Sequence, residues 1–387
     1  MAISEATPIR VMRIIARMNV GGPAVQVSGL MREMDRDDFD QRLYTGFCTA
    51  DEADYLETVA TDVNATRLLG FGRRVSLSGD LKAFFSLIKE IRSFKPHVIH
   101  THTAKAGFLG RLASILSLNP SIRVHTFHGH LLNGYFKGFK RFLIIMTEKA
   151  LAHFTHQLLA VGDQVRADLL EAGIGDLRKF GLMPPGLKIN KLPDKNTSLE
   201  FYGLKKAKLH CALIGRVTRI KRPDRFLDVV SELKQRGVDL DFFIAGDGEL
   251  MDQCREKIQR DNLPVTILGW QSDIERILSA ADIVILTSDN EGTPLCLIQA
   301  GMASLPVVTT GVGSVPEIVI DKVSGFITSL DVNDLADALC KLVNSPGLRQ
   351  QMGKSAKEYT TVNFGLNRLV HDHEELYKRL LVSTVIS

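Results

Sequence analysis

The chain has 387 residues, a formal net charge of +4, 45% hydrophobic residues and 24% charged residues. A length of this size suggests two domains, and the composition is ordinary for a globular protein with well-developed cores. The mild positive charge is compatible with phosphate-bearing ligands or an anionic membrane surface, but it is too small to indicate a nucleic-acid-binding protein.

Short β-branched runs alternate with amphipathic helical stretches throughout the first half of the chain. The runs that predict strands are residues 10–16, 41–47, 65–69, 97–102, 123–128 and 156–161. The stretches that predict helices are residues 24–34, 81–94, 107–118, 139–152 and 164–171. Alternation of this kind, with nearly continuous apolar strands, predicts a parallel sheet with helices on both faces.

The second half of the chain repeats this scheme. Its predicted strands are residues 210–215, 241–246, 265–269, 282–288 and 306–310. Pro223 and Gly237 delimit a predicted helix, because proline favours the first helical turn and glycine the position after the last. Residues 184–208 are rich in Pro, Lys, Asn and Asp and show no clear period, so we place the linker there.

This organisation predicts an α/β protein with two Rossmann-like domains whose parallel sheets face a central cleft. We expect an N-terminal domain over residues 1–190, a second domain over residues 191–365, and a C-terminal helix, residues 366–387, that packs back on the N-terminal domain. In open α/β sheets, ligands bind at the carboxyl ends of the strands. The residues directly after strands are therefore the candidates for function.

Two glycines, Gly21 and Gly22, lie between the first predicted strand and the first helix. Glycine lets the backbone approach a ligand closely, and the free N–H groups of a helix N-terminus attract anions; the alternative is a plain tight turn. The third glycine of a GxGxxG motif is absent, and no acidic residue sits suitably after the second strand. Both absences argue against a dinucleotide-dependent dehydrogenase.

Two cations, Arg216 and Lys221, follow the first strand of the second half. Their spacing would allow both to contact one anionic group, and a pyrophosphate leaving group needs fixed positive charge where negative charge develops. The alternative is a solvated basic loop, because Arg219 and Arg222 lie alongside. The residues alone leave these two interpretations open.

The run NEGTPLCLIQ, residues 290–299, places Glu291 on a Gly-Thr-Pro turn before a predicted apolar helix. The backbone N–H groups of Thr293, Leu295 and Cys296 would be able to bind a phosphate, and Glu291 would accept hydrogen bonds from hydroxyl groups beside it. A helix-capping acid is the alternative. That alternative explains Glu291 but not the clustering of residues 292–294.

Several histidines lie near two strand ends of the first half, and they are His100, His102, His125, His128 and His130. No cysteine or acid completes a metal-ligand set around them. A satisfied imidazole is the plainer interpretation of any single one, but we expect at least one to line the ligand site. The five scattered cysteines form no CxxC pair, so we expect neither a disulfide framework nor a zinc site.

The N-terminus lacks the marks of a secretory peptide, and no run of about 18 uninterrupted apolar residues spans a bilayer. Together with the cysteine usage, this predicts a cytoplasmic protein that is not integral to a membrane. Residues 134–146 interleave four aromatic side chains with lysine and arginine. They form either a peripheral contact with the anionic inner face of a membrane or an ordinary amphipathic helix with its aromatic side chains turned inward.

Taken together and in order, the motifs of this chain resemble the retaining glycosyltransferases of family 4, which have the GT-B fold, and especially the bacterial members that build surface polysaccharides. The motifs that carry the resemblance are GG at 21–22, HTHTAKAGFLGR at 100–111, HTFHGH at 125–130, PPGL at 184–187, GRVTRIKRPD at 215–224, AGDGEL at 245–250, EGTPLCLIQA at 291–300 and GSVPEIV at 313–319. Each motif is weak alone, but their order and spacing cover almost the whole chain.

The resemblance implies transfer of a hexosyl group from a nucleotide-sugar, with UDP as the first expectation, to a glycan or lipid-linked acceptor in polysaccharide biosynthesis. It further implies retention of configuration, with no obligatory metal, no other cofactor and no close carboxylate pair of the kind used by retaining hydrolases. The catalytic residues implied are His128 on the transferred sugar, Arg216 and Lys221 on the diphosphate, and Glu291 on sugar hydroxyls. The donor-binding residues implied are Gly21, Gly22, Trp270, Gly292, Thr293, Pro294, Leu295 and Gln299.

This chain departs from the family pattern at a few positions. Gln299 and Ser304 stand where the family usually has Glu and Gly, and Lys188 stands where relatives often show Asp. Because Gln299 keeps an acceptor oxygen for the ribose but lacks the charge, we expect donor binding weaker by about tenfold, or ~1.4 kcal/mol. Two alternative functions stay open: a nucleotide-sugar 2-epimerase of the same architecture, and a catalytically weak subunit that binds a sugar nucleotide.

Overall fold

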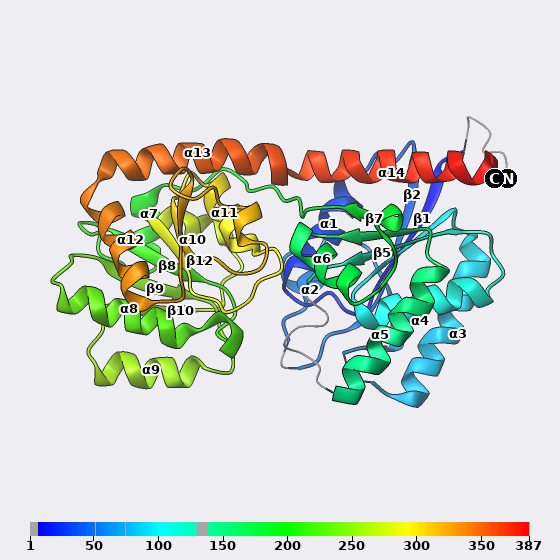
Figure 1. Ribbon diagram of the computed structural model, residues 1–387, viewed down its shortest axis with the longest axis horizontal. Helices are drawn as coiled ribbons and strands as arrows, with labels where there is room; N and C mark the ends of the chain where they lie inside the picture. Colours follow the sequence, from blue (N-terminus) through cyan, green and yellow to red (C-terminus); the bar gives the residue numbers. More distant parts are fainter. Residues whose placement is uncertain (1–6, 51, 74, 130–137, 387) are drawn as a thin grey trace. The chain divides into compact units, whose positions relative to one another are not determined.

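The computed structural model describes residues 7–50, 52–73, 75–129 and 138–386. They form two compact units, one ending at Leu187 and resuming at Leu366, the other running from Lys188 to Gly365. Each unit is a parallel β-sheet between layers of helices (Figure 1). The predicted α/β class with two parallel sheets is therefore confirmed, whereas the expectation that the two sheets face a shared cleft stays a prediction.

The first unit contains seven parallel strands in the order β3-β2-β1-β4-β5-β6-β7. Its elements are β1 (Ile9–Ile15), α1 (Gly22–Glu33), β2 (Phe39–Phe47), α2 (Tyr55–Thr58), β3 (Thr66–Gly72), α3 (Leu77–Phe94), β4 (Val98–His102), α4 (Ala104–Leu116), β5 (Ile122–Phe127), α5 (Gly138–His153), β6 (Gln157–Ala160), α6 (Asp163–Glu171), η1 (Leu177–Lys179), β7 (Phe180–Leu182) and α14 (Leu366–Ile386). The six predicted strands are present, and β7 and α2 are additional. The strand order changes direction between β1 and β4, so the ligand-binding edge of this sheet is expected there.

Helices cover both faces of this sheet because successive strand residues point to opposite faces. Val11 packs with α1 and α14, whereas Met12 and Ile14 pack with α3 and α4. Figure 1 shows α14 on one side of the unit and α3 to α5 on the other. The C-terminal helix therefore forms part of the first core.

The second unit contains six parallel strands in the order β10-β9-β8-β11-β12-β13. Its elements are α7 (Lys195–Phe201), β8 (His210–Ile214), η2 (Arg219–Lys221), α8 (Pro223–Gln235), β9 (Asp241–Ala245), α9 (Met251–Arg260), β10 (Val265–Gly269), α10 (Ile274–Ala280), β11 (Ile283–Leu286), α11 (Leu295–Met302), β12 (Val307–Thr310), η3 (Val315–Glu317), β13 (Gly325–Thr328), α12 (Val332–Asn344) and α13 (Pro346–Phe364). The order changes direction between β8 and β11. Both Arg216 and Glu291 follow strands at that point.

The prediction of a linker over residues 184–208 is wrong for most of its length. The second unit begins at Lys188, and residues 195–201 form α7. The side chain of Asp194 accepts a hydrogen bond from the backbone N–H of Thr197 at 2.9 Å and caps this helix, which packs against α10. Capping and tertiary packing therefore order a stretch that shows no helical period in the sequence.

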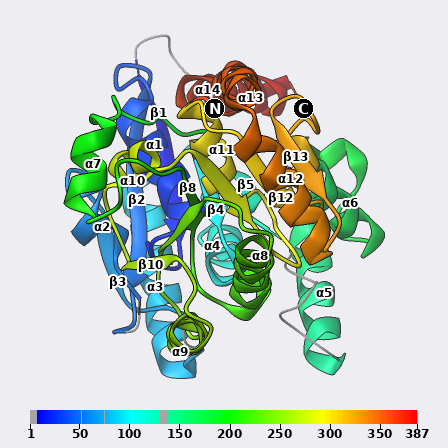
Figure 2. The same cartoon turned by 90° about the vertical axis from the view of Figure 1, so that its left-hand side faces the viewer.

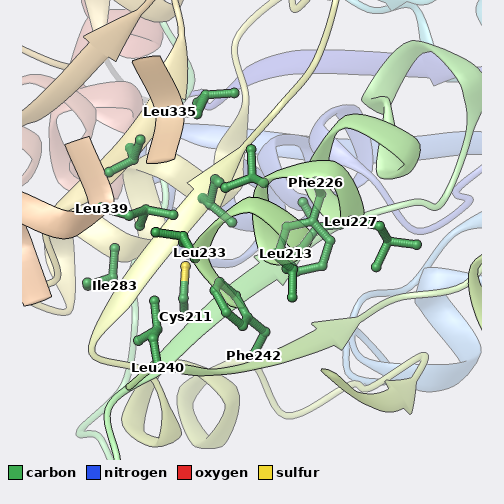
Figure 3. Packing of buried hydrophobic residues seen from close by; sticks show 14 of the residues in the cluster. Cys211, Leu213, Phe226, Leu227, Leu233, Leu240, Phe242, Ile283, Leu335 and Leu339 are labelled. Carbon is green, nitrogen blue, oxygen red and sulfur yellow. The ribbon is translucent and has the colours of Figure 1, made fainter. Parts of the chain in front are cut away.

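The core of the second unit lies between its sheet and the helices α8, α9 and α12. Figure 3 shows Phe226 and Leu227 of α8, Leu335 and Leu339 of α12, and Phe242 of β9 within one cluster. In Figure 2, α7, α10 and α11 lie on the other side of the strands. The helices cover the two faces of the sheet but not the ends of its strands. The candidate site residues follow the carboxyl ends of these strands.

Candidate functional site

The carboxyl ends of β8 and β11 bring a lysine and a glutamate into contact. The ammonium Nζ of Lys221 donates a hydrogen bond to Oε1 of Glu291 at 2.6 Å, and Ser288 Oγ donates to the same oxygen at 2.5 Å. The side chain of Glu291 is only 8% exposed and that of Lys221 is 19% exposed. The buried carboxylate thus has a cationic and a hydroxyl partner, as a buried charge requires.

The turn that carries Lys221 is fixed to the end of β11. Thr287 Oγ1 donates to the backbone carbonyls of Lys221 and Arg222 at 3.1 and 3.0 Å. The backbone N–H of Asp289 donates to the carbonyl of Ile220 at 2.9 Å. These bonds join segments almost 70 positions apart in the sequence, so the geometry of the Lys221–Glu291 pair does not depend on the two side chains alone.

A glycine in the loop after β12 supports the backbone of Glu291. Gly313 has φ 53°, and a Cβ atom there would lie 1.8 Å from the carbonyl oxygen of Glu291. The backbone N–H of Ser314 donates to that same oxygen at 3.3 Å. Only glycine fits this close approach with this backbone conformation, which accounts for the glycine of the GSVPEIV motif.

The charges at this edge of the sheet are strongly coupled. Burial opposes the charge of Lys221, but the Glu291 carboxylate outweighs it, and the pKa of Lys221 is raised above its usual value even though Arg216 acts in the opposite direction. Burial raises the pKa of the Cys296 thiol to about 11. Lys221 therefore stays an ammonium, Cys296 stays a neutral thiol, and the exposed Arg216 adds a second positive charge.

Two other cations of this segment, Arg222 and Arg225, have structural partners. Arg222 forms ion pairs with Asp224 and Asp289 at 2.8 and 3.0 Å, and Arg225 pairs with Asp289 at 2.7 Å. The alternative interpretation as a solvated basic loop is therefore wrong for Arg222, whereas Arg219 is exposed to solvent. The structure separates Lys221, which is turned to Glu291, from neighbours that hold the loop in place.

Helix α11 begins at Leu295, directly after the turn that follows Glu291. Pro294 is buried and occupies the N-cap position, so it precedes the first helical turn, which starts at Leu295. Gly292 and Thr293 are half-buried, and Gln299 is half-buried in the second helical turn. Within the described part of the chain, the Gln299 amide has no side-chain hydrogen bond, so it is available to a ligand.

Trp270 directly follows β10 and is 41% exposed. It lies at the same edge of the sheet as Glu291, because the backbone N–H of Gly246 after β9 donates to the carbonyl of Gly269 at 2.8 Å. The strand β9 separates β10 from β8, so Trp270 lies further along this edge than Lys221. The donor-binding roles of these residues stay predictions.

In the first unit, Gly21 caps α1 at the switch point of the sheet. Its φ of 162° is an extended conformation that any residue adopts. A Cβ atom at this position would find no closer protein atom than the carbonyl oxygen of Asn19 at 3.9 Å. Neither backbone conformation nor packing explains this glycine, and Gly22 beside it is the first residue of the helix.

The predicted histidines gather in the first unit, except His130, which lies outside the described residues. His102 Nδ1 lies 2.9 Å from His128 Nε2. His125 Nδ1 lies 2.8 Å from the hydroxyl of Thr101. Burial lowers the pKa of His128 to about 4, so its ring is neutral near pH 7. Among the described residues, no group of three or more His, Cys, Asp or Glu side chains is arranged to hold a metal ion.

Two contacts among the candidate residues were not predicted from the sequence. Ser288 was not singled out, although it directly follows an apolar strand and precedes Glu291 by three residues. The contact between His102 and His128 joins the ends of two neighbouring strands, β4 and β5. Hydroxyl and imidazole side chains at adjacent strand ends were the signal that would have indicated both.

The first turns of α5 expose apolar side chains. Phe139, Phe142 and Met146 are 72%, 56% and 49% exposed. Of the two alternatives, the one in which the aromatic side chains turn inward is therefore wrong for Phe139 and Phe142. The aromatic residues at 135 and 136 lie outside the described residues. Among the described helices, none is long and apolar enough to cross a membrane.

Comparisons with known proteins agree with this architecture. The family model of the glycosyl transferase 4-like domain matches residues 21–186, and the model of glycosyl transferases group 1 matches residues 208–345. The UDP-Gal:alpha-D-GlcNAc-diphosphoundecaprenol alpha-1,3-galactosyltransferase of Escherichia coli is 28% identical over 325 residues, which are 80% of this chain and 82% of that protein. The capsular polysaccharide biosynthesis glycosyltransferase CapM of Staphylococcus aureus is 22% identical over 330 residues, 83% of this chain and 86% of that protein.

The crystal structure of the Anabaena protein HepE in complex with UDP shares the fold. It has a TM-score of 0.80 at 17% identity and covers 96% of this chain and 100% of that chain. The two family models together span both units described above. The chain therefore belongs to the family 4 type of glycosyltransferases, has the GT-B fold and is a transferase enzyme.

Proposed function

We propose that this enzyme transfers a hexosyl group from a UDP-sugar to a lipid-linked or glycan acceptor in polysaccharide biosynthesis, with retention of configuration and without an obligatory metal ion. The observation that carries the proposal is the paired Lys221 and Glu291 beside Arg216 at the switch point of the second sheet. The Escherichia coli relative is named for UDP-Gal and a diphosphoundecaprenol-linked acceptor, and HepE was crystallised with UDP. Both names support the choice of donor and acceptor class.

Departure of a nucleoside diphosphate creates negative charge that must be stabilised. Arg216 and Lys221 supply two positive charges at a sheet edge where a helix N-terminus, that of α11, also begins. Fixed charges in a partly buried site stabilise a transition state without reorganisation of solvent. In this proposal the two cations do the work that a divalent cation does in metal-dependent transferases.

Glu291 accepts hydrogen bonds from hydroxyls of the donor sugar in this proposal. Its Oε1 already accepts from Lys221 and Ser288, and a carboxylate has further acceptor sites for sugar hydroxyls. In this proposal the ammonium of Lys221, which contacts the carboxylate, also contacts the diphosphate. A single pair thereby orients the sugar and the leaving group together.

Retention follows from a front-face route in which the leaving phosphate helps to deprotonate the acceptor. A double-displacement route would need a carboxylate nucleophile about 5 Å from a second carboxyl group. The Glu291 carboxylate is instead occupied by an ammonium and a hydroxyl, which makes it a poor nucleophile. Proton NMR of the product of transfer would identify its anomer, and an inverted product would contradict this part of the proposal.

A lipid-linked acceptor would be met at a membrane surface, and α5 is the element suited to that contact. Phe139 and Phe142 present aromatic rings to solvent, and aromatic side chains with neighbouring cations favour the interface of an anionic bilayer. Flotation with anionic liposomes at low salt tests this, with Phe139→Ser/Phe142→Ser as the matched variant. Equal recovery of wild type and variant would contradict the role of α5.

The experiment that tests the function is slow donor hydrolysis with a panel of UDP-, GDP- and ADP-sugars, with and without EDTA. We expect UDP release from one UDP-sugar that EDTA does not reduce and that Glu291→Gln abolishes. A 2-epimerase would change the sugar of the donor without transferring it to an acceptor. A binding subunit would become more stable to heat when the donor binds, but it would release no UDP. Either outcome would contradict the proposal.

A further inference from the structure

Two neighbouring histidines in the first unit form a hydrogen-bonded pair with two unused nitrogens. His102 Nδ1 lies 2.9 Å from His128 Nε2. Within the described residues, His102 Nε2 and His128 Nδ1 are buried atoms without a hydrogen-bond partner. Buried polar atoms normally have partners, so the two unused nitrogens need an explanation.

Both rings are neutral, and this couples their tautomers. Burial lowers the pKa of His128 to about 4, and burial also lowers the pKa of His102 well below its usual value. In a pair of neutral imidazoles, one ring nitrogen donates and the other accepts. If His102 Nδ1 donates, His128 must carry its own proton on Nδ1; if His128 Nε2 donates, its Nδ1 is an acceptor.

Exposure decides between these two arrangements. His102 is 2% exposed, whereas His128 is half-buried; although its Nδ1 atom is covered in the free protein, only the second ring borders on solvent. A buried N–H without an acceptor is rarer than an unsatisfied acceptor. The arrangement in which His102 Nδ1 donates leaves the unpaired N–H on His128 Nδ1, where a ligand oxygen can satisfy it.

The ring of His102 is itself held in place from the C-terminal helix. It stacks on His100 with 4.2 Å between ring centroids. His100 Nδ1 lies 2.6 Å from the hydroxyl of Tyr377 in α14, and Arg13 Nη1 donates to that hydroxyl at 2.9 Å. Arg13 can only donate, so the Tyr377 oxygen accepts from it, and the contact of this hydroxyl with His100 Nδ1 holds that ring in place as well.

We infer that His102 is a positioning residue that fixes the tautomer and orientation of His128, so that His128 Nδ1–H donates to an oxygen of a substrate bound at the ends of β4 and β5. The inference rests on the proposed function for its ligand. The tautomer itself is a property of the free protein. It can therefore be measured independently of turnover.

The test combines NMR and kinetics on the full-length chain. Two-bond proton–nitrogen spectra of histidine-labelled protein distinguish Nδ1–H from Nε2–H rings, and the His128 signals are identified by their loss in His128→Gln. We expect Nδ1–H for His128 in the wild type. We expect the same in His102→Asn, because the Asn amide N–H occupies the position of Nδ1, whereas the acceptor-only His102→Asp should move the His128 proton to Nε2.

The rates of two His102 variants distinguish a role of this residue in positioning His128 from a role in packing alone. His102→Gln has an amide at the position of Nε2 and should lower kcat about tenfold or more, whereas His102→Asn should restore it to within about threefold. An Nε2–H tautomer of His128 in the wild type, or equal kcat values for the Asn and Gln variants, would overturn the inference. Absence of turnover with every donor would contradict the proposed function, and the wild-type spectrum would still decide the tautomer.

Discussion

The contact between Lys221 and Glu291 should have a large coupling energy in the folded protein. Changing Lys221 to Met leaves the Glu291 carboxylate, 8% exposed, without its cation. Changing Glu291 to Gln leaves the Lys221 ammonium without its counter-charge. Breaking a buried ion pair by removing one partner costs 3–5 kcal/mol, and because Lys221 keeps 19% exposure we expect about 3 kcal/mol for each variant.

The double variant should be much less destabilised than two independent losses. Without either charge, no uncompensated ion stays in the site, so we expect a total loss of about 4 kcal/mol and a coupling energy of about 2 kcal/mol. The Ser288 hydroxyl keeps the Gln side chain hydrogen-bonded, which limits the cost of that replacement.

The sequence provides a probe for this measurement. Trp270 is the single tryptophan and lies in the second unit, so its fluorescence during urea unfolding reports on the unit that contains the pair. Arg219→Gln, an exposed cation on the same turn, is the matched control and should change stability by less than about 0.5 kcal/mol. A loss of stability in the double variant equal to the sum of the losses in the two single variants would refute the coupling between Lys221 and Glu291.

Three further outcomes follow from the structure. Gln299→Glu should lower the donor KM about tenfold (~1.4 kcal/mol), because a charged acceptor binds a ribose hydroxyl more strongly than an amide does; an unchanged or higher KM would contradict this. Gly21→Ala should raise the donor KM with no loss of thermal stability. The control Gly313→Ala should destabilise the fold, because Gly313, unlike Gly21, has a left-handed φ of 53° and a close backbone neighbour. Equal destabilisation by both variants would refute the interpretation of Gly21 as a ligand-binding glycine. The pKa of buried His373 is lowered to about 3, so its stabilising contribution is present above the unfolded pKa of about 6.5 and is lost as pH falls below it. When the pH is lowered from 7 to 5, this histidine alone should reduce the free energy of unfolding of the first unit by about 2 kcal/mol. Urea unfolding followed by circular dichroism should show a smaller reduction in His373→Gln. The same reduction in both proteins would refute this prediction.

The sequence was sufficient for most of the fold because the central strands are continuous apolar runs. Strand β8, for example, is buried at every position, and such a run has few alternatives to a covered parallel strand. The short edge strands β7 and β13 have three and four residues, too few to show a pattern. Helix α7 depends on a cap at Asp194 and on packing against α10, neither of which has a periodic signal.

The sequence indicated individual residues of the candidate site, but it did not indicate which of them contact one another. Strand-end position indicated Lys221 and Glu291 separately, because both follow apolar strands. Their hydrogen bond joins residues 70 positions apart, and nothing local in the sequence specifies it. The His102–His128 pair likewise depends on the register of β4 and β5, which only the folded sheet determines.

The central claim is that Arg216, Lys221 and Glu291 form the site where the donor diphosphate departs. The most direct test is the rate of UDP release from the preferred UDP-sugar in the wild type, Lys221→Met, Glu291→Gln and the control Arg219→Gln. The account predicts a loss of about a hundredfold or more in the first two variants and a rate within about threefold of wild type in the control. Wild-type rates in folded Lys221→Met and Glu291→Gln proteins would contradict it.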